Sequence, residues 1–181
     1  MVENEDNLVL KAAAGDPEAF GALYDEYHPR IYRFVYLKVG SREDAEDLAH
    51  QVFLNAWEHV PNYRRRGLPF SSWLYRIARN AVIDHYRTRK DEVSVEESDP
   101  DAFVSSERVQ MDAHLSLEIE KVQHAIAELA PMHQDVIIMR FVEELAIKEV
   151  AAALKKSEGA VKLLQHRAMR ELKQILGERQ D

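Results

Sequence analysis

Three consecutive arginines stand beside a tyrosine in a segment that two prolines and a glycine keep out of regular structure. The segment runs from Pro61 to Pro69 and contains Tyr63, Arg64, Arg65 and Arg66. Aromatic rings and guanidinium planes stack on unpaired bases, and a basic groove follows a phosphate backbone. The segment is therefore a candidate contact zone for a polyanion.

A second group of basic residues lies near the C-terminus, in the pattern of a helix-turn-helix. Apolar residues have helical spacing over 147–154 and 161–175, and Ser157 is the predicted N-cap of the second helix. The outward face of that helix carries Gly159, Lys162, Leu163, His166, Arg170 and Lys173, with Arg167 at the edge. Such a helix can enter the major groove of duplex DNA, where it contacts phosphates and bases. A plain helical hairpin is the alternative interpretation.

Two amphipathic helices, over residues 41–59 and 70–90, are predicted to hold the arginine-rich segment. The first helix has one apolar side, and its opposite side is acidic with Leu54 at the centre. Because an apolar residue there has no core to join, we interpret Leu54 as a contact for a partner. The outer stripe of the second helix consists of Arg76, Asn80, Ile83 and Arg87, with Arg79 beside it.

Charge is distributed unevenly along the 181 residues, whose net charge is −8. Residues 60–90 carry 8 basic and 1 acidic side chains, and residues 145–181 carry 8 and 5. Residues 91–112 carry 1 basic and 8 acidic side chains without periodicity, which predicts a flexible linker. Two basic zones separated by an acidic stretch favour two contact zones for a polyanion.

The helical spacing and the low glycine and proline content predict an all-α fold of two small helical domains. These domains are residues 1–90 and 113–181, joined by the linker 91–112. The chain has no cysteine, which fits a reducing compartment, and its N-terminus lacks the pattern of a signal peptide. No apolar run approaches the roughly 20 residues of a membrane span. A cytoplasmic protein is therefore predicted.

Two segments carry a resemblance to a known family. DAEDLAHQVFLNAW at Asp44–Trp57 and FSSWLYRIARNAVIDHYR at Phe70–Arg87 resemble region 2 of bacterial RNA polymerase sigma factors, in the extracytoplasmic-function (ECF) group. The helix-turn-helix resembles region 4 of the same family. The resemblance covers most of the chain and implies a subunit that binds core RNA polymerase and directs it to promoters.

The resemblance implies two surfaces in region 2. Docking on the β′ clamp helices of the polymerase is implied for Asp44, Asp47, Leu48, Gln51 and Leu54. Capture of a base flipped out of the promoter −10 element is implied for the loop with Tyr63 and Arg64–Arg66. On the following helix, Asn80 and Asp84 match positions that contact −10 bases, and phosphate contacts are assigned to Arg76, Arg79 and Arg87. Asp84 could equally pair with Arg87 at i, i+3.

In region 4 the resemblance implies a surface for the promoter −35 element and a contact with the polymerase β flap. The base readers are Lys162, Leu163, His166 and Arg167, and we assign Ser157 and Arg170 to the same surface. Lys155 stands where such turns often have a left-handed glycine, at a cost of roughly 1–2 kcal/mol. Lys156 stands where an apolar residue usually packs.

Enzyme functions are disfavoured, because the sequence has no HExxH motif, no glycine-rich phosphate loop and no nucleophile motif. No cofactor and no metal are predicted. The resemblance implies an anti-sigma factor as a further partner. Two other functions stay open: a repressor that binds duplex DNA without polymerase, and a polymerase-binding regulator that does not read promoters.

Overall fold

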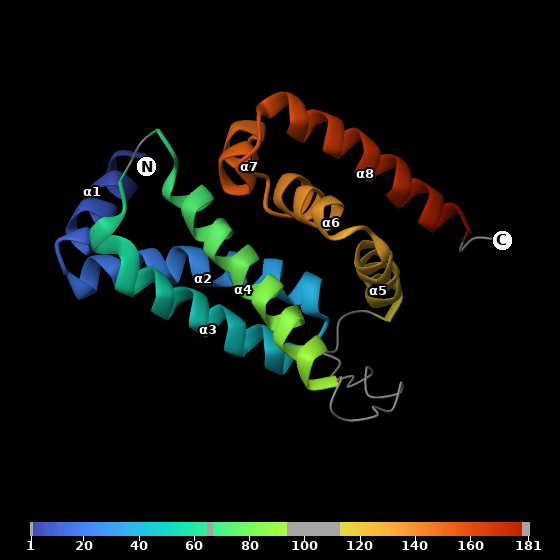
Figure 1. Cartoon of the computed structure of the whole chain (residues 1–181), viewed down its shortest axis with the longest axis horizontal. Coiled ribbons are helices and arrows are strands. Elements are labelled where there is room, and N and C mark those ends of the chain that lie inside the picture. Colours follow the sequence, from blue (N-terminus) through green and yellow to red (C-terminus); the bar gives the residue numbers. More distant parts are fainter. Residues whose placement is uncertain (1, 65–66, 94–112, 179–181) are drawn as a thin grey trace.

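The computed structural model describes residues 2–64, 67–93 and 113–178, and in these ranges the regular structure is helical (Figure 1). The all-α expectation is confirmed for this part of the chain. The helices are α1 (Val2–Ala13), α2 (Pro17–Val39), α3 (Arg42–His59), the short 3₁₀ turn η1 (Val60–Asn62), α4 (Phe70–Val93), α5 (Ala113–Glu128), α6 (Pro131–Ile137), the π-helical turn η2 (Ile138–Val142), α7 (Ile147–Leu154) and α8 (Glu158–Glu178). Most of the predicted linker, residues 94–112, lies outside the described residues.

Helices α1 to α4 form the N-terminal unit around one core. Local signals set its helix ends: Asp16 caps α2 through hydrogen bonds to two backbone amides, and Gly40 ends α2 in a left-handed conformation. Ser41 then caps α3, accepting a hydrogen bond from the Asp44 amide at 3.3 Å. The largest fully buried side chains of this unit are Leu23, Ile31, Phe34, Val35, Val52, Leu74 and Tyr75.

Helices α5 to α8 form the C-terminal unit, whose buried side chains include Ile126, Ile138, Met139, Leu145, Val150 and Val161. Helices α7 and α8 make the predicted helix-turn-helix. The hydroxyl oxygen of Ser157 accepts a hydrogen bond from the Ala160 amide at 3.1 Å, which confirms the predicted cap. Lys155 has the expected left-handed conformation, with φ 53° and ψ 46°, and Lys156 is exposed.

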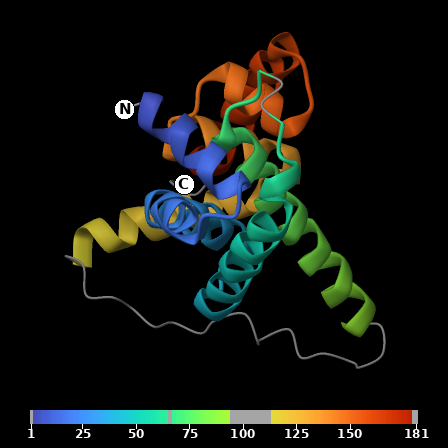
Figure 2. The same ribbon diagram turned by 90° about the vertical axis from the view of Figure 1, so that its left-hand side faces the viewer.

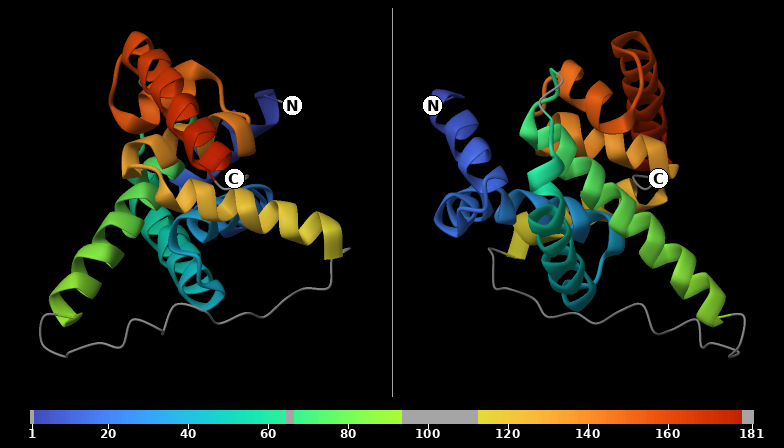
Figure 3. Two further views of the ribbon diagram at one scale, coloured as in Figure 1. Left: turned by 90° about the vertical axis from the view of Figure 1, so that its right-hand side faces the viewer. Right: turned by 60° about the vertical axis from the view of Figure 1, so that its left-hand side comes forward.

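The two units pack directly against each other. Figures 2 and 3 show the orange and red C-terminal helices seated over the blue and green N-terminal helices. Helix α7 packs on α4, while α5 and η2 contact α2. Helix α8 packs on α5, α6 and α7, so its outer surface faces away from the N-terminal unit.

Replacing the left-handed residue of the helix-turn-helix tests its backbone strain. We expect Lys155→Gly to raise the free energy of unfolding by about 0.5–1 kcal/mol, because relief of the left-handed conformation exceeds the added flexibility of the unfolded chain. Urea denaturation measures this change. Lys156→Gly is the matched control, since that residue lacks a positive φ, and it should give no gain. Equal stabilisation by both substitutions would contradict the assignment of strain to Lys155.

Candidate nucleic-acid and protein-binding surfaces

Helix α3 presents an acidic outer face with one prominent apolar side chain. Asp47, Gln51 and Leu54 are exposed, and Leu54 retains 52% of its accessible surface. Leu48 differs from the other members of the predicted set because only 5% of it is exposed, so it belongs to the core. Asp44 contacts two side chains of α4, because Arg89 Nη1 lies 3.3 Å and His85 Nε2 lies 3.8 Å from its carboxylate.

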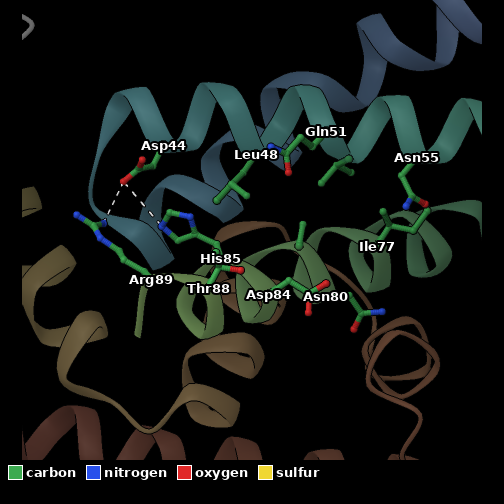
Figure 4. Close-up of a pocket in the computed structure, with 12 residues that line it drawn as sticks. Asp44, Leu48, Gln51, Asn55, Ile77, Asn80, Asp84, His85, Thr88 and Arg89 are labelled. Atoms are coloured by element: carbon green, nitrogen blue, oxygen red, sulfur yellow. Dashed lines mark hydrogen bonds and ion pairs between the residues drawn. The ribbon is translucent and has the colours of Figure 1, made fainter. Parts of the chain in front are cut away.

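A polar groove of about 640 Å³ lies between the exposed sides of α3 and α4, which pack against each other below it. In Figure 4, Gln51 and Asn55 line it from α3, while Asn80 and Asp84 line it from α4. The Asp44 contacts with Arg89 and His85 close one end. Residues predicted for two different partners, a protein and DNA, are therefore neighbours on one groove.

The loop after α3 is braced by its tyrosine. The Tyr63 hydroxyl donates a hydrogen bond to the Leu68 carbonyl at 2.6 Å, and its ring packs against Phe70 and Trp73 at centroid distances of 5.9 and 5.1 Å. Tyr63 thus shapes the loop through its side chain. Arg64 is exposed, with Nη1 3.4 Å from the Pro61 carbonyl. Arg65 and Arg66 lie outside the described residues.

The predicted DNA-binding residues of α4 divide into two groups. Asn80, Asp84 and Arg87 are exposed. Asp84 and Arg87 form an ion pair of 3.1 Å, which is the alternative that the sequence left open for Asp84. Arg76 and Arg79 instead turn toward the C-terminal unit. Arg76 donates hydrogen bonds to the carbonyls of Ala152 and Ala153 at the end of α7. A cation at a helix C-terminus is favourable.

Arg79 contacts a buried carboxylate that the sequence analysis missed. Its Nε lies 2.7 Å from Asp135 Oδ2 in α6, and Lys38 of α2 pairs with the other carboxylate oxygen. The Asp135 side chain is 1% exposed and that of Lys38 is 4% exposed. Burial lowers the pKa of Lys38, and the charge of Asp135 opposes that shift.

A second buried carboxylate, Glu143, follows η2 and has no exposed side-chain surface. Arg33 of α2 donates to both of its oxygens, at 2.7 and 2.8 Å, in a bidentate arrangement. Tyr75 of α4 donates its hydroxyl to the same carboxylate at 2.9 Å. Burial and the charge of Glu143 raise the pKa of Tyr75 well above its usual value, so the hydroxyl stays a donor. Neither Asp135 nor Glu143 belongs to a sequence motif. Their importance is visible only from the side chains that contact them in the folded chain.

Helix α8 carries the third surface, which faces solvent. The predicted side chains Ser157, Lys162, Leu163, His166, Arg167 and Arg170 are all exposed. Leu163 retains 50% of its accessible surface, although it is apolar. Val161 and Ala168, on the opposite side, are fully buried. The helix therefore holds its basic face outward, in the orientation that major-groove binding requires.

Comparison with known proteins agrees with this division into two units. Residues 23–92 match the family model of Sigma-70 region 2, and residues 125–174 match that of Sigma-70 region 4. The chain is 30% identical over 179 residues to the ECF RNA polymerase sigma factor SigW of Bacillus subtilis, covering 93% of this chain and 94% of SigW. This chain belongs to the ECF RNA polymerase sigma factors.

Two further similarities concern the length and the fold of this sigma factor. It is 37% identical over 170 residues to the ECF RNA polymerase sigma factor BldN of Streptomyces coelicolor, covering 93% of this chain and 64% of BldN. The chain thus spans about two thirds of that longer relative. The solved structure of the sigma factor RpoE with the anti-sigma factor NepR from Bartonella quintana has a TM-score of 0.73 at 22% identity, covering 87% of this chain and 96% of RpoE. That likeness shows a shared fold.

Sigma factors are transcription initiation factors whose regions 2 and 4 contact the promoter −10 and −35 elements. In this sigma factor, α2 to α4 lie in or overlap the region 2 match, and α5 to α8 lie in or overlap the region 4 match. In the described parts of the sigma factor, no helix combines the length and the apolar character of a membrane span.

The Tyr63 hydroxyl offers a test of how the loop of region 2 is held. We expect Tyr63→Phe to lower the free energy of unfolding by about 1 kcal/mol, because the Leu68 carbonyl loses its hydrogen bond while the ring packing remains. Tyr36→Phe is the matched control on α2 and should change the unfolding free energy by less than about 0.5 kcal/mol. Urea denaturation checks both, and equal losses would contradict a bracing role for the Tyr63 hydroxyl.

Proposed function

We propose that this sigma factor divides its work among the outer face of α3, the exposed side of α4 with the preceding loop, and the outer face of α8. Core RNA polymerase binds the first, the −10 element the second and the −35 element the third. One observation carries this assignment. The acidic face of α3, with Leu54 at its centre, and the basic face of α8 are both exposed, and they lie on different units. The proposed domains are residues 1–90, 91–112 and 113–181.

For polymerase docking, Leu54 is the proposed centre, with Asp47 and Gln51 around it. An exposed leucine gains free energy when a partner covers it, and the carboxylates favour a basic partner surface. Asp44 contributes only in part because Arg89 and His85 of α4 already lie against its carboxylate. Leu48 supports the face from the core. The polymerase β′ clamp helices are the proposed partner.

For the −10 element, the exposed side chains Asn80, Asp84 and Arg87 are the proposed contacts, together with Arg64 of the loop. An amide side chain can make two hydrogen bonds to one base edge. Arg65, Arg66 and Tyr63 remain part of the proposed loop surface. Arg76 and Arg79 join the phosphate contacts only after they leave region 4.

For the −35 element, α8 is the proposed major-groove helix. Lys162, His166 and Arg167 reach toward base edges, Leu163 meets a thymine methyl group, and Ser157 and Arg170 contact the backbone. Region 4 is also the proposed site of contact with the polymerase β flap.

By the same assignment, this sigma factor is a non-catalytic protein. It acts in the cytoplasm, where its polymerase and promoters are. The assignment also makes an anti-sigma factor a proposed partner. RpoE is a structural neighbour that forms a complex with the anti-sigma factor NepR. Such a partner would compete for the faces that polymerase and DNA require.

Pull-down with bacterial core RNA polymerase, followed by run-off transcription from a random promoter library, tests the function as a whole. We expect polymerase binding and transcripts that share −35 and −10 sequences. Polymerase binding without transcripts would support a regulator that does not read promoters. Binding to duplex DNA without polymerase would support a repressor.

Polymerase docking through α3 is tested by Leu54→Asp. We expect at least about a tenfold loss of affinity for core polymerase, because a charge replaces the apolar centre of the contact. Fluorescence anisotropy of the labelled sigma factor measures this. Leu10→Asp on α1 is the matched control, since Leu10 is also an exposed leucine, and it should leave the affinity unchanged. Unchanged binding of Leu54→Asp would reject α3 as the docking face.

Recognition of the −35 element through α8 is tested by Arg167→Ala. We expect the affinity of the holoenzyme for promoter duplex to fall by about tenfold, which corresponds to the loss of one specific base contact. Binding to core polymerase should stay the same. Lys121→Ala on the exposed side of α5 is the control for charge loss within region 4. A drop in both promoter and polymerase binding would contradict the separate roles.

A further inference from the structure

Region 4 places two acidic side chains into the basic side of region 2. Asp135 accepts from Arg79 at 2.7 Å and pairs with Lys38, and Glu143 accepts from Arg33 at 2.7 and 2.8 Å. Both carboxylates come from region 4, whereas all three cations come from α2 and α4 of region 2. We refer to these contacts, Asp135 with Lys38 and Arg79 and Glu143 with Arg33, as the interdomain ion pairs.

Further polar contacts cross the same boundary. On α4 the hydroxyl groups of Ser71 and Ser72 donate hydrogen bonds to Glu149 of α7, each at 2.9 Å. Arg76, one turn further along α4, binds the carbonyls at the end of α7. Water could replace the partners of these hydroxyl, carboxylate and carbonyl groups when the regions separate. A phosphate could take the place of the carbonyls that bind Arg76. These contacts lie beside apolar packing, since buried side chains of both regions join one cluster. Polar contacts at a boundary between domains favour their relative motion.

This packing is incompatible with simultaneous recognition of both promoter elements. By their names, the −35 and −10 elements lie about 25 base pairs apart, or roughly 85 Å of duplex at 3.4 Å per pair. Helix α4 has 24 residues and is therefore only about 36 Å long. Two regions in direct contact cannot span that separation. The interdomain ion pairs must break before both elements are bound.

The packed state blocks the three proposed surfaces unequally. Arg76 and Arg79 are engaged by region 4, so they are withheld from phosphates. The α3 residues Asp47, Gln51 and Leu54 remain exposed, and so does the outer face of α8. The packed sigma factor can therefore meet polymerase while part of its −10 surface is covered.

We propose that Asp135 and Glu143 are autoinhibitory residues: they occupy the basic side chains of region 2 as internal substitutes for DNA phosphates and hold the free sigma factor closed. When the two regions separate, water solvates these carboxylates. Arg76 and Arg79 then become available to the −10 strand. The release of Arg76 and Arg79 to DNA rests on the proposed role of α4 in DNA binding. Closure itself does not rest on that role, because it concerns only the contacts between the two regions, to which the interdomain ion pairs contribute.

The distance between the regions tests closure without any DNA. Because the chain has no cysteine, Glu18→Cys on α2 and Gly177→Cys on α8 allow specific labelling of the full chain for fluorescence energy transfer. We expect the double substitution D135N/E143Q to lower the transfer efficiency. The matched control D25N/E144Q makes the same change in net charge at exposed residues and should leave the efficiency unchanged.

A third variant separates a local effect from net charge and from misfolding. Arg33→Gln removes the bidentate partner of Glu143 on the region 2 side and changes the net charge in the opposite direction. It should lower the transfer efficiency as D135N/E143Q does, while far-ultraviolet circular dichroism shows native helix content in both. Unchanged transfer efficiency in both folded variants would overturn the autoinhibitory role.

Binding of single-stranded DNA tests the second half. With a labelled pool of random 12-nucleotide strands, we expect D135N/E143Q to bind about tenfold more tightly than the native chain, which corresponds to a native open fraction of roughly a tenth. D25N/E144Q, with the same net charge, should not gain affinity. Reduced transfer efficiency without tighter binding would leave closure standing and reject the proposed phosphate role of Arg76 and Arg79. Tighter binding with unchanged transfer efficiency would reject closure as its cause.

Discussion

A carboxylate without access to water is the constraint on which the arrangement of the two regions depends. Glu143 has no exposed side-chain surface, and an unpaired charge there would be strongly unfavourable. Its hydrogen-bond donors Arg33, which is cationic, and Tyr75, which is neutral, lie 110 and 68 residues away in the sequence. Region 4 can therefore bury Glu143 only where α2 and α4 supply these donors. Burial of the carboxylate thus fixes which surface of region 4 meets region 2.

The sequence predicts the helices well because the signals that form them are local. Apolar spacing places Val161 and Ala168 on one side of α8, and Ser157 caps its start within three residues. The left-handed turn at Lys155 follows from the same short pattern, although lysine is a poor residue for it. The exposed faces of α3 and α8 follow directly, because each helix has only one apolar side to bury.

The sequence does not predict what covers a polar helix face. Arg76 and Arg79 lie on the outer side of α4 when that helix is considered alone, and a basic outer side indicates solvent or DNA. Their actual partners, the end of α7 and Asp135, are more than 50 residues distant. No periodicity connects residues across such a separation. Tyr63 is a similar case, because its hydroxyl bond to Leu68 depends on the closed shape of the loop.

The interdomain ion pairs also account for how an acidic protein can carry a strongly basic helix such as α4. A guanidinium group presents the same donors to a carboxylate as to a phosphate, so Asp135 satisfies Arg79 in the way a DNA backbone would. The net charge of −8 gives no long-range attraction to DNA while these cations are neutralised. Separation of the regions changes no charge, but it redistributes positive potential onto α4. In the closure that we propose, access to the promoter is therefore governed by the position of two carboxylates rather than by the overall charge of the chain.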